Sequence, residues 1–157
     1  MCKFASFVLT KDQVFYSETG DSHSNIISQN NLNEWGTHGP NIVKVEISPT
    51  DEIKTWPSLK AWAFRVDQDV LPEWADAETC EKRTRAALRR RAKKGFQTVD
   101  ARGCTALKEL KADAATYVDA SGCTALKELK AGAAKTVYAR GCTTDLKIMA
   151  KGAKIYR

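Results

Sequence analysis

The sequence contains no run of about 18 consecutive apolar residues, so no membrane-spanning helix is predicted. Its first ten residues lack the apolar core and the small-residue cleavage site of a secretory signal, so export is not expected. The five cysteines are an odd number, which together with the missing signal favours free thiols in a reducing cytoplasm. Hydrophobic residues make up 43% of the 157 residues, which is too many for a disordered chain.

Histidine is scarce, with only His23 and His38 in the chain. Three cysteines recur every 19 residues, at Cys104, Cys123 and Cys142, and stacking of equivalent segments would place their sulfurs in a column. Zinc normally takes four ligands, and no histidine or fourth cysteine lies near these three in the sequence. We therefore interpret the column as a buried structural ladder and predict neither a metal nor a cofactor.

The net charge of +6 conceals a division of the chain into two halves. Residues 1–80 contain 6 basic and 12 acidic side chains, a net charge of −6, whereas residues 81–157 contain 19 and 7, a net charge of +12. The segment 71–95 predicts a helix that begins at Pro72, has acidic residues in its first half and ends near Gly95. Its basic second half, which includes Arg89 and Arg90, would attract phosphates or an acidic partner.

An internal repeat of 19 residues is the strongest pattern in the sequence. Residues 100–112 return nearly unchanged as residues 119–131, and a degraded copy begins at Tyr138. One copy of this length cannot bury its own apolar face, so neighbouring copies must stack. The spacing of small and apolar residues predicts a shared inward column in each copy, such as Ala115, Val118, Ala120, Cys123 and Leu126.

Each copy is expected to contain a strand and a short helix. The strand is predicted at Tyr117 to Ala120, and Gly122 permits the turn that follows it. Thr124 could cap a helical stretch at Ala125–Lys130. This frame resembles the bacterial leucine-rich repeat of the "GCTALKEL" type over about residues 96–157, with Ala and Val at several Leu positions. The resemblance implies a short β/α solenoid.

Outward strand positions of such solenoids commonly form a binding surface. Tyrosine and arginine favour recognition, and here they are mixed with aspartate. The candidate binding residues are Arg102, Tyr117, Asp119, Tyr138, Arg140 and Tyr156. A rigid platform without a binding role is the alternative. The last turn, which ends at Tyr156, could also pair with another copy to form a homo-oligomer.

The N-terminal part predicts an α+β unit with an antiparallel sheet of about four strands. Residues 3–10 are apolar on both faces, as expected for a central strand, and strands are also predicted at 14–16, 42–47 and 62–66. A short helix would carry Ile26, Ile27 and Leu32. The expected organisation is therefore an α+β domain at 1–70, a basic connecting helix at 71–95 and a leucine-rich-repeat-like solenoid at 96–157.

The stretches MCKFASFVLTKD, GPNIVKVEIS and VDQDVLPEW resemble uncharacterised small proteins of phages and prophages, over about residues 1–90. This resemblance implies a host-cell cytoplasm as the location and a host component as the partner. It implies no chemistry.

One candidate catalytic set lies near the N-terminus. Removal of Met1 would expose Cys2 as a nucleophile beside its own α-amine, with His23 and Asp21 as a generic thiol-activating pair. Lys3 stands where amidohydrolases of this kind would have a glycine, and a structural role for Cys2 is the alternative.

Three functions are consistent with these patterns. The first is a binding protein that captures a host macromolecule or an anionic small ligand through its repeat surface and interferes with host defence. The second is an amidohydrolase-like enzyme that uses Cys2. The third is a nucleic-acid-binding protein that uses the basic helix. None of the three involves a membrane, and we favour the first.

Overall fold

The computed structural model describes residues 5–17, 22–50 and 52–157 of the chain. These residues form two compact units. One unit comprises the described residues of 5–47 and 64–90, and the other those of 48–63 and 91–157. The α+β class is confirmed, because the first unit contains an antiparallel sheet and the second is a parallel β-solenoid.

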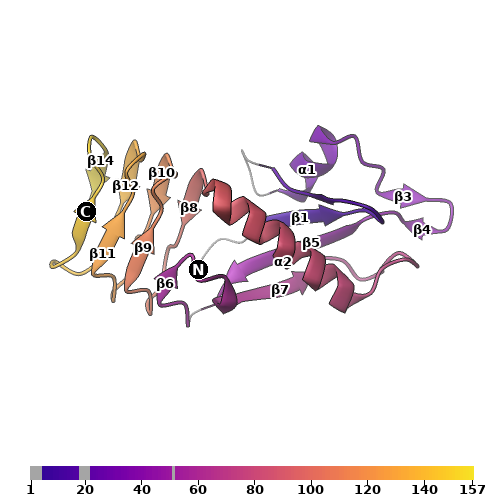
Figure 1. Cartoon of the computed structure of the whole chain (residues 1–157), viewed down its shortest axis with the longest axis horizontal. Helices are drawn as coiled ribbons and strands as arrows, with labels where there is room; N and C mark the ends of the chain where they lie inside the picture. The colour runs from indigo at the N-terminus through magenta and orange to yellow at the C-terminus, as the bar shows by residue number, and fades with distance from the viewer. Residues whose placement is uncertain (1–4, 18–21, 51) are drawn as a thin grey trace. The chain divides into compact units, whose positions relative to one another are not determined.

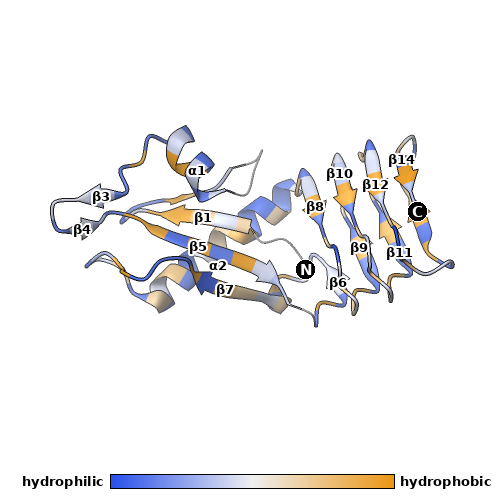
Figure 2. Cartoon of the chain, turned by 180° about the vertical axis from the view of Figure 1, so that it is seen from behind, coloured by the Kyte–Doolittle hydropathy of each residue, from blue (hydrophilic) through white to orange (hydrophobic). Residues whose placement is uncertain are grey.

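The sheet of the first unit has the strand order β2-β1-β5-β7. Its strands are β1 (Ala5–Leu9), β2 (Val14–Phe15), β5 (Val43–Pro49) and β7 (Trp62–Val66), shown in Figure 1. β1 pairs antiparallel with both β2 and β5, and all five of its residues are buried. The prediction of a central strand with two apolar faces is confirmed, and Figure 2 shows the apolar residues along it.

Helix α1 (His23–Gln29) packs against the sheet through Ile26, which forms a buried cluster with Val8 and Ile42. The expected helix is thus present, but it ends before Leu32, which packs against the same cluster from the loop. The following segment contains the small hairpin of β3 (Trp35–Gly36) and β4 (Gly39–Pro40).

Helix α2 (Ala77–Lys94) begins five residues later than Pro72, where the sequence predicts its start. The side chain of Asp76 accepts a hydrogen bond of 2.8 Å from the backbone N–H of Thr79, and this N-cap sets the first turn. Gly95 ends the helix with a φ of +86°, as predicted. Within the described part of the chain, no helix has the length and apolar character needed to cross a membrane.

The second unit consists of two parallel sheets in which each coil of the solenoid contributes one strand to each sheet (Figure 1). The first sheet has the order β14-β12-β10-β8 and the second the order β13-β11-β9-β6. Equivalent residues pair at an interval of 19 from β8 to β12, as Val99 with Val118 and Val118 with Val137, and at an interval of 18 between β12 and β14, as Val137 with Ile155. The first sheet contains β8 (Thr98–Asp100), β10 (Tyr117–Asp119), β12 (Thr136–Tyr138) and β14 (Lys154–Tyr156). The second contains β6 (Thr55–Trp56), β9 (Glu109–Lys111), β11 (Glu128–Lys130) and β13 (Lys147–Met149).

The short helix predicted at Ala125–Lys130 is wrong. Residues Glu128–Lys130 form strand β11, which pairs on both sides with parallel neighbours, and Thr124 lies in the turn before it. A helix of six residues is marginal, because its nucleation fixes several residues for one hydrogen bond. The ladder satisfies the same backbone groups with equivalent residues of the adjacent coils, while Leu129 still points inward and is fully buried.

The repeat cysteines lie on the inward side of the first sheet. Cys104 and Cys123 are fully buried, and the thiols of Cys123 and Cys142 donate to the carbonyl oxygens of Ala101 and Ala120 at 3.0 and 3.1 Å. Burial raises the pKa of Cys123 to about 12, so this thiol is neutral at pH 7. These contacts agree with a structural ladder for Cys123 and Cys142, whose thiols are free. Cys104, by contrast, is disulfide-bonded, so the prediction of free thiols is wrong for this residue.

An aromatic cluster packs within the second unit. The rings of Trp56 and Trp62 lie 5.1 Å apart, and Phe96 stacks on Trp62 at 6.0 Å with an interplanar angle of 11°. Both tryptophans are buried, so this cluster is part of the hydrophobic core.

Candidate binding face of the solenoid

The outward side chains of the sheet formed by β8, β10, β12 and β14 lie in columns set by the parallel register. Asp100, Asp119, Tyr138 and Tyr156 occupy equivalent positions in successive strands. Tyr117 lies two residues before Asp119 and therefore points to the same side of the sheet. The outward side therefore changes from acidic in the first two coils to aromatic in the last two.

The three tyrosines form a continuous row of rings. The ring centroids of Tyr138 and Tyr156 are 4.6 Å apart with an interplanar angle of only 8°, so these two rings are stacked. Tyr117 contacts Tyr138 at 5.8 Å with a tilt of 48° and is 37% exposed. We call Tyr117, Tyr138 and Tyr156 the tyrosine row. Stacking holds the rings in place before any ligand arrives, and this lowers the entropy lost on binding.

Two cations flank the tyrosine row. The guanidinium carbon of Arg140 lies 5.9 Å from the centroid of the Tyr138 ring, and the ammonium nitrogen of Lys154 lies 5.1 Å from that of Tyr156. A hydrogen bond to Tyr156 raises the pKa of Lys154, so this residue remains charged near neutral pH. Both side chains are exposed, and neither forms an ion pair with a carboxylate among the described residues.

Arg102, by contrast, is neutralised within the sheet. Its Nε and Nη2 donate to the carboxylate of Asp100 at 2.9 and 2.7 Å, and Nε lies 3.7 Å from Asp119. The hydrogen bond to Asp100 and the charge of that residue raise the pKa of Arg102. Arg102 therefore stabilises two largely buried carboxylates. The exposed positive charge beside the tyrosine row comes instead from Arg140 and Lys154.

The second sheet has a different charge pattern. In two of its strands, β9 and β11, a lysine pairs with the glutamate two residues before it: Lys111 with Glu109 at 2.9 Å and Lys130 with Glu128 at 2.8 Å. The described part of this sheet has no aromatic row comparable to that of the first. It therefore provides a matched control surface made of the same repeats.

The structure brings six of the predicted binding residues onto one side of one sheet: Arg102, Tyr117, Asp119, Tyr138, Arg140 and Tyr156. Sequence reasoning missed Lys154, although the predicted outward position of Tyr156 implies that Lys154, two residues earlier on the same strand, points outward as well. Ile155, on the last strand, is 42% exposed, and pairing of this strand with another copy stays a prediction.

Arg89 and Arg90 are exposed on α2, which agrees with their predicted accessibility. Other basic residues of this helix have partners within the chain. Arg83 donates to the carbonyl oxygens of Thr10 and Gln13, and Arg85 pairs with Glu81 at 2.7 Å. The surface available to a phosphate backbone is therefore smaller than the sequence suggests.

The proposed catalytic set cannot be assembled from the described residues. Cys2 and Asp21 both lie outside them, as does Met1. His23 is described, and its two ring nitrogens face Asp67 and the carbonyl oxygen of Val45. His38 is exposed in the hairpin turn.

Comparison with known proteins gives no relative. No protein-family model, curated protein or solved structure significantly matches the chain. No matched protein therefore indicates its function.

Proposed function

We propose that the chain is a binding protein that captures an acidic segment of a partner protein on the tyrosine row. The observation that carries this proposal is the stacked Tyr138–Tyr156 pair, flanked by the exposed cations Arg140 and Lys154. Tyrosine and arginine are enriched among residues that dominate interface energy. An acidic partner complements the charge at this end of the sheet and would be steered toward it.

The resemblance of the N-terminal part to phage and prophage proteins supports a host protein as this partner. Under this proposal, capture in the host cytoplasm would interfere with the partner's normal role, including a role in host defence. An anionic small ligand would satisfy the same cations, but it would leave most of the tyrosine row unused.

A capture experiment with variants on the two sheets tests the proposal. The immobilised wild-type chain, the variant Tyr138→Ala/Arg140→Ala and the control Lys111→Ala/Lys130→Ala are incubated with host lysate, and retained proteins are quantified by mass spectrometry. We expect the Tyr138→Ala/Arg140→Ala variant to retain at least tenfold less of an acidic host protein than the wild type does. The control should retain as much of it as the wild type. Circular dichroism checks that both variants fold. Equal retention by wild type and the Tyr138→Ala/Arg140→Ala variant would contradict the proposal.

Nucleic-acid binding is tested separately on α2. Binding of mixed DNA and RNA through Arg89 and Arg90 would weaken steeply with salt and fall in an Arg89→Gln/Arg90→Gln variant. We expect little binding at physiological salt, because two neighbouring arginines are already engaged by the chain. Strong binding that depends on salt and on these two arginines would favour the nucleic-acid function instead.

A further inference from the structure

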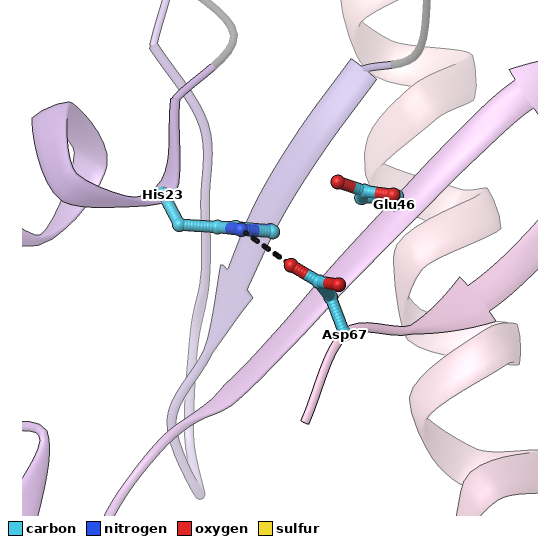
Figure 3. A group of neighbouring side chains, drawn as sticks. All are labelled: His23, Glu46 and Asp67. Carbon is cyan, nitrogen blue, oxygen red and sulfur yellow. Dashed lines mark ion pairs between the residues drawn. The ribbon is translucent and has the colours of Figure 1, made fainter. Parts of the chain in front are cut away.

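His23, Glu46 and Asp67 are distant in the sequence but meet on one face of the N-terminal sheet (Figure 3). His23 is the first residue of α1, Glu46 lies in β5, and Asp67 follows β7 directly. One potential ligand atom from each residue lies within 4.8 Å of the other two. Figure 3 shows the three side chains converging on the side of the sheet away from α2.

The hydrogen bonding of His23 indicates which ring nitrogen is available. Nε2 lies 3.0 Å from the carbonyl oxygen of Val45, and a carbonyl can only accept, so Nε2 carries a proton. In neutral imidazole Nδ1 is then a bare lone pair, and it faces Oδ2 of Asp67 at 3.4 Å. Two lone-pair atoms at this distance repel each other unless a cation lies between them. That cation is either a proton on Nδ1 or a metal ion.

The hydrogen bond from Nε2 of His23 to the carbonyl oxygen of Val45 is of a kind that metal-binding histidines commonly make. Such a histidine donates its other ring N–H to a carboxylate or a backbone carbonyl, which fixes the tautomer and the orientation of the ring. The carbonyl of Val45 provides this contact from β5, the strand that also carries Glu46. The His23 and Glu46 side chains are each only 12% exposed, whereas Asp67 is 39% exposed, so water can reach the site from the side of Asp67.

The positive charge of Arg65 balances the negative charges of the Glu46 and Asp67 carboxylates. It hydrogen bonds to Glu46 and lies 3.4 Å from Asp67, yet its own side chain is 66% exposed. The exposed guanidinium can rotate into solvent, and a metal ion would then replace it as the cationic partner of the largely buried Glu46 carboxylate. Arg65 is therefore a competitor that a metal ion can displace from the carboxylates of Glu46 and Asp67.

We propose that His23, Glu46 and Asp67 form a binding site for a divalent transition metal ion such as Zn²⁺. Nδ1 of His23 and one oxygen from each carboxylate supply three ligands, and water completes the coordination. A neutral imidazole and two carboxylates balance the charge of the ion. Ligand atoms around tetrahedral zinc lie about 3.4 Å apart, so His23 and Asp67 already have this separation and Glu46 needs only a small side-chain movement.

Titration of the full chain with Zn²⁺, followed by isothermal calorimetry, tests the site. We expect one ion per chain, with affinity at least tenfold lower in His23→Gln and in Asp67→Asn. The control is His38→Gln, which changes the chain's other histidine and should bind as the wild type does. Co²⁺ provides a second readout, since its absorption spectrum should show nitrogen and oxygen ligation without a thiolate charge-transfer band.

Arg65 provides the sharpest test. Arg65→Gln removes the competitor for both carboxylates, so we expect Zn²⁺ to bind about tenfold more tightly than to the wild type. If the cluster is only an ion pair between a protonated His23 and the carboxylates, neither the wild type nor Arg65→Gln will bind one Zn²⁺ ion. That result overturns the proposal, as does unchanged binding in both His23→Gln and Asp67→Asn.

Discussion

Gly103, Gly122 and Gly141 occupy the same left-handed conformation in three successive coils, with φ of 73°, 76° and 70°. The sequence predicts a turn at this position from the recurring glycine, and the structure shows why glycine recurs. A side chain would crowd the following carbonyl in this region of backbone space. The repeat can lose leucines and still stack, but its turn depends on this conformation.

Gly122→Ala should therefore lower the free energy of unfolding by about 1–2 kcal/mol, because the left-handed conformation penalises a Cβ atom. The control is Gly132→Ala in the same coil, where φ is not in the left-handed range and a Cβ would meet only an oxygen of Asp113 at 3.6 Å. Urea unfolding of both variants measures the difference. A loss of equal size at Gly132 would show that the conformation of Gly122 is not the cause.

Burial of Cys123 predicts a pH dependence of stability. Its pKa rises from 9.0 in the unfolded chain to about 12 in the fold, because burial penalises the thiolate. Above pH 9 the unfolded state loses this proton first, so the contribution of Cys123 is complete below pH 9 and falls as pH rises toward 12. Cys123→Ala should show a shallower loss of stability than the wild type between pH 9 and 11. Parallel curves for the two proteins would contradict the prediction.

At the scale of single residues, the 19-residue repeat and the alternation of side chains along each strand predicted the inward column and most of the outward candidate binding residues. They could not reveal the cluster of His23, Glu46 and Asp67. A histidine and two acidic residues separated by about 20 positions carry no local signal, and only the pairing order of the sheet brings them together.

At the scale of elements, the apolar strands of the N-terminal sheet were predicted correctly from the sequence. The second half of each repeat was predicted to be a helix, but it forms a strand. The residues Glu-Leu-Lys carry good helix formers, which favours helix when one copy is considered alone. The same three residues alternate outward and inward, and hydrogen bonds to adjacent coils decide the outcome. Tertiary pairing thus overrides local propensity in β9 and β11.

A pair of substitutions at Lys111 distinguishes strand from helix in solution. Lys111 lies at the exposed end of β9, at the position equivalent to Lys130. Lys111→Thr and Lys111→Ala both remove the ion pair with Glu109, so their difference reports backbone preference. In a strand the threonine variant should be more stable by up to about 1 kcal/mol, and in a helix the order reverses. Thermal unfolding of the two variants gives the sign.

At the scale of the whole molecule, the second compact unit includes residues 48–63 together with the repeats. Thr55 and Trp56 form a strand that pairs with Glu109 and Leu110. No repeat pattern marks these residues, because they provide the first strand of one sheet without sharing the sequence of the coils. Such a long-range pairing cannot be deduced from composition or period.

Removing one complete coil should leave a folded protein. Deletion of residues 119–137 joins Val118 to Tyr138 and preserves the inward alternation of every later strand. Deletion of 119–136, only one residue shorter, places Val137 on the outward side and disrupts the stacking. We expect cooperative unfolding for the first variant, at lower stability than the wild type because one coil interface is lost. Urea unfolding followed by circular dichroism distinguishes the two deletion variants. Loss of structure in both variants would contradict the prediction.

The near identity of residues 100–112 and 119–131 also has a consequence for inheritance. Where the coding DNA of the two stretches matches as closely as their residues do, the copies pair out of step during replication or recombination, and each crossover between them inserts or removes 19 codons in frame. The products differ by one whole coil. The gene can therefore lengthen or shorten the solenoid in steps of one strand spacing, about 4.8 Å, without first passing through an unfolded intermediate sequence.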